Sequence, residues 1–547
     1  MPIARSARSF TRTSIALACT AALLSCANVP APFAPDFTAR APHLDGYGSS
    51  SIAITTRSEA ARKLFNEGVL QAYAFNENEA VRTFKAALAQ DPECAMCAWG
   101  VAWQLGPNIN DSGRREADAV NYVDYALKRL ANATPRERAL VEALAIRYAH
   151  ESTARETAPL VAMVCGKGAA SESDDVNPLD AAYADRMRKL ADAYPMDADI
   201  LSLYAEAELI ATPGDDAWTA DGKPVGRVGE VADRLERLLT ANTGHTGINH
   251  YMIHMVDDRH VAHRAVAAAD RLGKLAPLSP HLVHMPAHTF VNVGRYADAV
   301  RVNESAVAAD ATLAQTQKAQ GFETTKDWRG HNQHFLWYAS LMAEREDAAM
   351  TTALAMREMF PGTPHAFAEY VNSLPLVTLV RFEQWDKILA QPKPEGDRGI
   401  SQLWFEYARG VAQARLGRLA EADATLVALK ATATGVKDKY TKSSRQQRNL
   451  RAMADTAQAG LQAEVALAKK QFDEAIAQQQ AMVKAAEKID AQEPPALGDG
   501  TKLKLGEIQL RAGKFKEAEA TYREALVERP GSPWAARGIA KAIEKKA

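Results

Sequence analysis

Histidine is the residue type whose placement points most clearly to chemistry in this 547-residue sequence. Ten of the 13 histidines lie between His245 and His334, far more than an even spread would place there. Two pairs stand out, because His250 and His254 are four residues apart and so are His284 and His288. Two histidines at positions i and i+4 of a helix can each turn a ring nitrogen toward one metal ion.

The two pairs also share a longer period, since each member of the second pair follows its counterpart by 34 residues. His281, His284 and His288 are spaced as one stripe of a helix. Repeat units beginning at Thr246, Pro280 and Gly330 would place His250, His284 and His334 at one equivalent position. The third start comes 50 residues after the second, so we expect an insertion before it. We therefore predict a transition-metal site for Zn, Cu, Ni or Fe, with candidate ligands His250, His254, His281, His284, His288, His331 and His334. The alternative is that these rings hydrogen-bond to their neighbours or bind a peptide.

The same segments give little support to catalysis. The first pair lacks the glutamate that would act as a base in a metalloprotease, and the nearby carboxylates Glu206, Asp257, Asp258 and Glu323 are weak candidates. Neither a phosphate-binding glycine loop nor a nucleophilic serine elbow is recognisable. We assign no catalytic residue, and expect Pro286 to kink its helix between His284 and His288.

The cysteines fall into separate classes. Cys94 and Cys97 form a close pair after Asp91-Pro92, at the expected start of a helix, where a thiol pKa is lowered. We predict a structural disulfide, with a redox or metal role as the alternative. Cys165 precedes a Gly/Ser/Asp-rich loop and could remain a free thiol, whereas Cys19 leaves with the leader described next.

The N-terminus reads as a targeting signal. Three arginines precede a short apolar run, Ile15 to Leu24, which is too short to span a bilayer. The run ends in Leu23-Leu24-Ser25-Cys26, which resembles a bacterial lipobox with Cys26 as the lipidated residue. We expect a lipoprotein signal peptide over residues 1–25, then a tether over 26–50 rich in Pro, Ala and Ser. Plain secretion with cleavage near Ser25 is the alternative.

These features must be positioned by helices, because alanine is abundant almost throughout and the chain is too long for one core. A 34-residue period runs through it. Its clearest copies span about 499–532 and 61–94, with small residues where paired helices touch and a proline after the second helix. The pattern is that of tetratricopeptide repeats (TPRs). It predicts an all-α, TPR-type α-solenoid of helix-turn-helix repeats, in which the histidine stripe lines the concave groove.

The predicted organisation has three parts after the tether. TPR-like helices with the cysteine pair occupy 51–175, histidine-rich repeats 176–350, and C-terminal repeats with a capping helix 351–547. The net charge of −2 becomes −5 once residues 1–25 are removed, so we expect no nucleic-acid partner.

Several segments together resemble a family of bacterial TPR proteins with a Cys-Ala-Met-Cys motif and histidine-rich central repeats. They include Asp91 to Gly100, Leu105 to Asn108, Leu203 to Glu206, Asn249 to Tyr251, His281 to Pro286 and His331 to Phe335. The resemblance supports the fold and the histidine segments but implies no reaction.

We therefore expect an envelope-anchored scaffold that binds a protein or peptide in its concave groove and touches the membrane only through its lipid. It would be an outer-membrane lipoprotein facing the periplasm, with the metal site nested in the groove. A metal-dependent hydrolase or oxygen-using enzyme on the same cluster is the alternative.

Overall fold

A computed structural model of the 547-residue chain describes residues 33–50, 52–111, 113–149, 176–213, 216–325, 328–359, 366–394, 399–442, 444–489, 494–495 and 500–546. These ranges form helices joined by short turns, with two isolated β-bridges and no strand among the described residues. The predicted signal peptide, Cys26 and Cys165 lie outside these ranges. No helix within them is both long and apolar enough to cross a bilayer.

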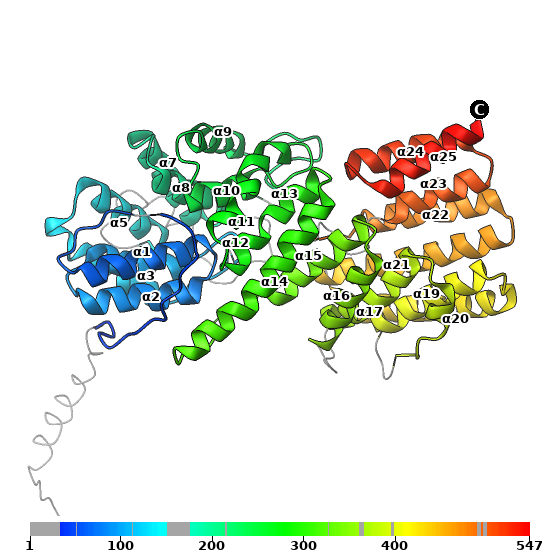
Figure 1. Ribbon diagram of the computed structural model, residues 1–547, viewed down its shortest axis with the longest axis horizontal. Helices are drawn as coiled ribbons and strands as arrows, with labels where there is room; N and C mark the ends of the chain where they lie inside the picture. The colour runs from blue at the N-terminus through cyan, green and yellow to red at the C-terminus, as the bar shows by residue number, and fades with distance from the viewer. Residues whose placement is uncertain are drawn as a thin grey trace, which may run out of the picture.

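The N-terminal part consists of antiparallel helix pairs (Figure 1). Its helices are α1 (Glu59–Tyr73), α2 (Glu77–Gln90), α3 (Ala95–Gln104), α4 (Asp118–Leu127) and α5 (Pro135–Arg147), with a short 3-10 turn, η1 (Leu130–Asn132), before α5. Gly68 and Gly100 show why small residues recur at the helix contacts. A Cβ on Gly100 would lie 2.5 Å from the Phe84 ring, and one on Gly68 2.7 Å from it. The ring can fill the space between α1 and α3 only because both positions lack side chains.

The central part carries the histidine segments. Its helices are α7 (Pro178–Ala193), α8 (Ala198–Ile210), α9 (Val228–Leu239), α10 (Thr246–Met255), α11 (Val266–Leu275), α12 (Pro280–His284), α13 (Pro286–Asn292), α14 (Tyr296–Ala319) and α15 (Arg329–Met342), with the 3-10 turn η3 (Ala262–Ala265) before α11. The repeat starts predicted at Thr246, Pro280 and Gly330 fall at the starts of α10, α12 and α15 to within one residue.

The 50-residue interval before the third start has a simple cause. The extra residues mostly lengthen α14, which has 24 residues and extends beyond its neighbours (Figure 1). The expected kink at Pro286 is present too, because the helix is divided into α12 and α13 at Met285.

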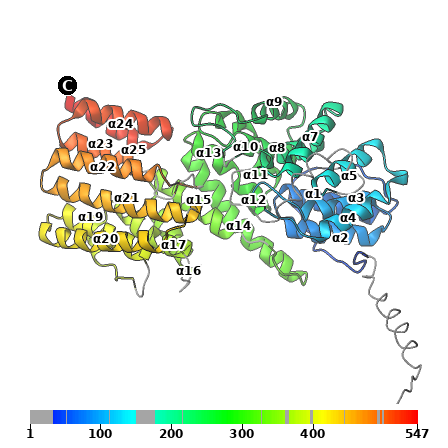
Figure 2. The same ribbon diagram turned by 180° about the vertical axis from the view of Figure 1, so that it is seen from behind.

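The C-terminal part continues the same stacking (Figure 2). Its helices are α16 (Glu346–Glu358), α17 (Ala366–Arg381), α18 (Trp385–Leu389), α19 (Gly399–Arg415), α20 (Leu419–Lys439), α21 (Arg445–Ala468), α22 (Phe472–Ala486), α23 (Gly500–Arg511), α24 (Phe515–Glu528) and α25 (Pro533–Lys546). The protein is an all-α, TPR-type solenoid, as the 34-residue period predicts.

The last helix does more than cap the array. The turn before α25 reaches back to the central part, where Tyr296 donates a hydrogen bond to the Pro530 carbonyl at 3.0 Å. Trp534 donates to the Leu341 carbonyl at 3.3 Å, and Arg537 pairs with Glu344. The C-terminal repeats therefore curl back until their end meets α15.

Residues 33–50 are the described part of the predicted tether over 26–50. This segment, which we call the strap, lies against the folded body. The side chains of Leu44 and Tyr47 are buried. The Ser49 amide donates to Thr246 Oγ1 at 2.8 Å, and the Leu278 amide donates to the Gly46 carbonyl at 3.0 Å. Scattered apolar residues among the Pro and Ser of this segment provide the anchoring that overall composition hides.

Candidate metal centre

Six of the seven predicted ligands are arranged in two groups of three. The N-terminal triad consists of His250, His254 and His281, and the C-terminal triad of His284, His288 and His331. Within each triad, one candidate ligand atom from each ring lies within 4.8 Å of the others.

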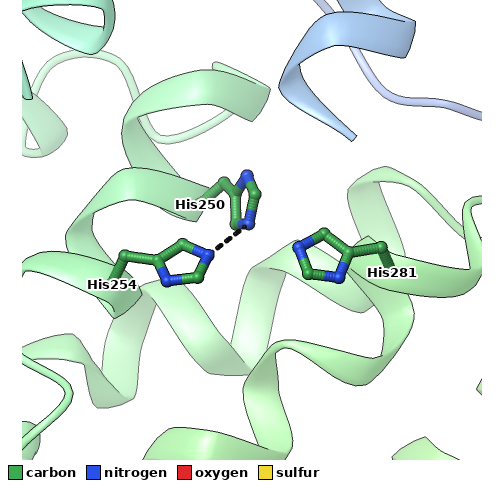
Figure 3. A group of neighbouring side chains, drawn as sticks. All are labelled: His250, His254 and His281. Carbon is green, nitrogen blue, oxygen red and sulfur yellow. Dashed lines mark hydrogen bonds between the residues drawn. The ribbon is translucent and has the colours of Figure 1, made fainter. Parts of the chain in front are cut away.

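The N-terminal triad combines two repeats. His250 and His254 come from α10, and His281 faces them from the first turn of α12 (Figure 3). The Nε2 atoms of His250 and His254 are 3.1 Å apart. The helix itself places this pair together, because residues four apart are neighbours on its surface. The packing of α12 beside α10 supplies the third ring.

The C-terminal triad repeats this construction one unit later. His284 and His288 flank the kink at Met285, yet their Nε2 atoms are only 3.0 Å apart. His331, from the first turn of α15, has its ring centroid 4.6 Å from that of His284. In both triads, a pair of histidines from one repeat is completed by a single histidine from the next repeat. That third histidine, His281 or His331, lies three residues before His284 or His334, the residues equivalent to His250.

His334 does not join either triad. Its Nε2 lies 3.0 Å from the Tyr370 hydroxyl, and its ring stacks on Trp337 at 5.7 Å. It occupies the position equivalent to His250 and His284, but its partner at that site is a tyrosine of α17. The structure therefore gives His334 a hydrogen-bonded packing role instead of a place in the cluster.

The predicted groove-lining stripe is buried. His250, His281 and His284 are at most 1% exposed, and His288 is 5% exposed. Aromatic rings cover the cluster. The ring centroid of Phe75 lies 4.6 Å from that of His250 and 5.0 Å from that of His281. The centroid of Trp328 lies 4.2 Å from that of His281, and the centroid of Phe335 lies 4.5 Å from that of His288. Phe75 reaches the cluster from the α1–α2 turn, so the site also depends on the N-terminal part.

Hydrogen bonds define the tautomers in the C-terminal triad. Asn303 donates its amide Nδ2 to the Ala299 carbonyl at 2.8 Å, so its Oδ1 is an acceptor, and His284 Nδ1 lies 2.6 Å from it. His288 Nδ1 lies 2.7 Å from a carboxylate oxygen of Asp257. Both Nδ1 atoms therefore act as donors, and in the neutral rings both Nε2 atoms carry lone pairs directed at each other.

This arrangement suits a cation. Two lone pairs 3.0 Å apart repel unless a proton or a metal ion lies between them. Two nitrogens bound to one tetrahedral ion at ordinary zinc–nitrogen distances are about 3.3 Å apart. The carboxylate on the outer nitrogen of His288 matches the second-sphere partner that metal-binding histidines commonly have.

Burial keeps most of these rings neutral. It lowers the pKa of His250 to about 3, and it lowers the pKa of His254 and of His284 well below the ordinary value. Burial likewise lowers the pKa of His331 to about 3. Neutral imidazole is the form that binds metal, so these four ligands do not first have to lose protons at neutral pH.

The other carboxylates named from the sequence have different roles. Glu206 is fully buried and accepts hydrogen bonds from Trp103 Nε1 at 2.9 Å and the Tyr251 hydroxyl at 3.0 Å. Asp258 lies 2.8 Å from His260 Nδ1, away from both triads. Of the four, Asp257 bonds a triad histidine, through His288 Nδ1. The flanking aromatics and Asn303 were not predicted, although Phe335 follows His331 by one helical turn and could have been found by that spacing.

Ser50, His245 and Asp199 lie together beside the strap, but their hydrogen bonds do not activate the serine as a nucleophile. His245 Nδ1 accepts the Ile248 amide and caps α10, while its Nε2 lies 3.0 Å from Asp199. Ser50 donates to the same carboxylate at 2.8 Å, and its Oγ lies 3.2 Å from His245 Nε2. Because His245 Nδ1 accepts the Ile248 amide, Nε2 carries the proton of the neutral ring. The serine proton thus faces the carboxylate, and no nitrogen of His245 is left to take it as a general base.

Cys94 and Cys97 are bonded in the structure, with an S–S distance of 2.10 Å and both side chains fully buried. Cys94 is the N-cap of α3, so the bridge lies at the predicted helix start. It belongs to the packing of the N-terminal repeats.

No protein-family model and no curated protein matches the sequence. Among solved structures, the chain resembles the TPR domain of P58(IPK), with 12% identity, a TM-score of 0.23 and coverage of 89% of this chain and 98% of that one. Cut9–Hcn1 from the APC/C gives 10% identity, a TM-score of 0.25 and coverage of 89% and 97%. Yeast Tom70 shows 11% identity and a TM-score of 0.26, with coverage of 89% of this chain and 95% of that one. At these TM-scores the likenesses support no inference about ligands or partners.

Proposed function

We propose that this protein is a TPR-type binding scaffold that holds two transition-metal ions, one in each histidine triad. The observation that carries the proposal is the pair of facing Nε2 atoms in the C-terminal triad, with the outer nitrogens of both rings bonded to Asn303 and Asp257. In this protein, three imidazoles face a common point in each of two triads, which lie at equivalent positions of successive repeats.

The distances are close to those of a bound state. The i, i+4 pairs are already 3.0 and 3.1 Å apart, and the third ring of each triad would move inward by on the order of 1 Å to reach a common ion. Imidazole suits Zn, Cu, Ni and Fe.

Binding is favoured over catalysis. An enzyme on this cluster would need a base beside the open coordination position. Asp257 is held by His288 at 2.7 Å and by Asn292 at 2.9 Å. The rings over the cluster belong to Phe75, Trp328 and Phe335, none of which transfers protons.

Metal content of the purified chain tests the proposal. The parent protein should bind two ions per chain after reconstitution, and a His250→Ala/His284→Ala variant should bind none tightly. His334→Ala is the matched control, because that buried histidine lies in the same register but outside both triads, and it should retain both ions. Failure of the parent protein to bind any of the four metals would refute the proposal.

A protein or peptide partner fits the C-terminal repeats better than the buried central stripe. A cavity of about 470 Å³ lies between α17, α19, α23 and α25, and four basic and two acidic side chains line it. The indole nitrogen of Trp404 in its wall is buried without a hydrogen-bond partner among the described residues. An acidic segment would supply both an acceptor and the opposite charge. A glutamate-rich peptide should quench the tryptophan fluorescence of the chain, whereas a lysine-rich peptide of equal length should not.

The envelope location remains part of the proposal and rests on the lipobox-like sequence. We propose that Cys26 is lipidated, that the body faces the periplasm from the outer membrane, and that no nucleic acid binds. Metabolic labelling with a fatty acid should mark the parent chain but not a Cys26→Ser variant.

A further inference from the structure

The ligands of the two triads are all imidazoles, and this limits the charge that the cluster can hold. Six imidazoles contribute no negative charge. Within the described parts of the chain, Asp257 is the carboxylate bonded to a triad ring, through His288. Glu206 is engaged by Trp103 and Tyr251 instead. Two divalent ions would therefore bring four positive charges, and among the described residues the Asp257 carboxylate offsets one of them.

The two triads are also contiguous. Ring centroids from different triads approach to 6.3 Å for His281 and His284 and to 6.4 Å for His254 and His288. Centroids within one triad are up to 6.1 Å apart, as for His254 and His281. Ions in the two triads would share a wall of imidazoles, and in a buried site their repulsion is weakly screened.

The surroundings offer little help to an added anion. A zinc ion held by three imidazoles normally completes its coordination with water or hydroxide. The rings that cover these triads are the hydrocarbon faces of Phe75 and Phe335 and the indole of Trp328. A hydroxide there would be a second buried charge beside apolar walls, which costs free energy.

We propose that the two triads hold copper(I), one ion in each; this inference rests on the proposed metal-binding function and identifies the ion. Imidazole donors alone do not discriminate between zinc and copper. The charge of the bound ion does. Two monovalent ions repel each other about four times less than two divalent ions at the same separation. The cost of burying each ion falls in a similar way, because it grows with the square of the charge.

Coordination number points the same way. Copper(I) is satisfied by three donors in a plane and needs no fourth ligand, so the triad and its aromatic cover form a complete site. With copper(I) in both triads, the carboxylate of Asp257 offsets half of the added charge. The paired imidazole triads under their aromatic cover are thus matched to a monovalent ion.

The test is an anaerobic competition on the full chain. Copper(I) is titrated in against the chromophoric chelator bathocuproine disulfonate, and zinc(II) is titrated separately against a zinc indicator. We expect two copper(I) ions per chain of similar affinity, whereas the second zinc(II) ion should bind at least about tenfold more weakly than the first. Equimolar zinc(II) added to the copper-loaded protein should leave both copper ions bound.

The outcomes separate the two proposals. Displacement of copper by zinc, or two zinc ions bound with equal affinity, would overturn the copper assignment and leave the metal-binding function standing. If neither metal binds, the copper assignment fails, and the metal-binding function fails with it when nickel and iron do not bind either. X-ray absorption of the copper-loaded parent chain needs no substitution and should show three nitrogen neighbours; sulfur neighbours would also overturn the assignment.

Single-ligand variants locate the ions. His281→Ala and His331→Ala each remove one ring from a different triad, and each should lower the copper content from two ions to one. His334→Ala should keep two, and circular dichroism checks that every variant is folded. A content of two in both ligand variants would overturn the placement of one ion in each triad.

Discussion

Asp257 provides the sharpest test of how the C-terminal triad works. Its carboxylate lies 2.7 Å from His288 Nδ1, and its other oxygen accepts from Asn292 at 2.9 Å. Asp257→Asn keeps the shape of the side chain but removes its charge and replaces one acceptor with a donor. The amide can then match only one of its two neighbours without a rearrangement.

The expected loss follows from this position. Changing the partner of a metal-binding histidine typically lowers metal affinity by about 10–100-fold. That corresponds to about 1.4–2.7 kcal/mol, since each tenfold change is about 1.4 kcal/mol. Both orientation and charge contribute, because the amide holds the His288 ring less firmly and no longer offsets the charge of the ion.

The assay isolates one triad. In a His281→Ala background, the N-terminal triad lacks one ligand, so a single tight ion should remain, and its affinity is measured by chelator competition at neutral pH. Asp258→Asn in the same background is the matched control, because this neighbouring carboxylate bonds His260 and not a triad ring. If Asp257→Asn and Asp258→Asn bind the ion equally, within about twofold, then the second-sphere role assigned to Asp257 is wrong.

Three further predictions concern pH, packing and the strap. First, the metal-free protein should lose stability below about pH 6.5, the ordinary pKa of an unfolded histidine. Burial lowers the pKa of His250 to about 3 and of His334 to about 4, so the unfolded chain binds more protons. Each of these histidines should cost about 2 kcal/mol by about pH 5, and urea unfolding with a flat pH profile would contradict this. Second, Gly100→Ala should destabilise the fold by about 1–3 kcal/mol, because its Cβ would meet Phe84. Gly435→Ala, in a helix with open space around it, should instead stabilise the fold by about 0.5–1 kcal/mol in the same urea titration. Third, Thr246→Val removes the hydroxyl that bonds the strap at Ser49, so limited proteolysis within residues 33–50 should accelerate while both metals stay bound. Unchanged cleavage would show that the strap does not depend on this hydroxyl.

Much of the fold was predictable because it is local. Helix starts at Thr246, Pro280 and Gly330 follow from the period and from capping residues such as Ser279, whose hydroxyl accepts the Leu282 amide. The extra residues before α15 were recognised as an insertion, but their conformation was not predicted. They continue α14, whose sequence offers no stop before Gly321.

The strap shows where composition misleads. Residues 33–50 contain enough Pro, Ala and Ser to resemble a free linker, yet Leu44 and Tyr47 are buried against the repeats. A linker is defined by what it does not contact, and contacts between residues about 200 positions apart, as for Ser49 and Thr246, cannot be seen in a local pattern.

The sequence by itself determined which rings share a helix face. The pairs at i and i+4 are fixed by helix geometry, and the 34-residue period fixes their equivalence between repeats. Only the tertiary structure decided how the rings are grouped. His281 joins the preceding pair instead of its own stripe, His331 does the same one repeat later, and His334 is left to Tyr370. The reason is that contacts between helices depend on how each repeat packs and rotates against the next, and that rotation is set by side chains distributed over the whole interface.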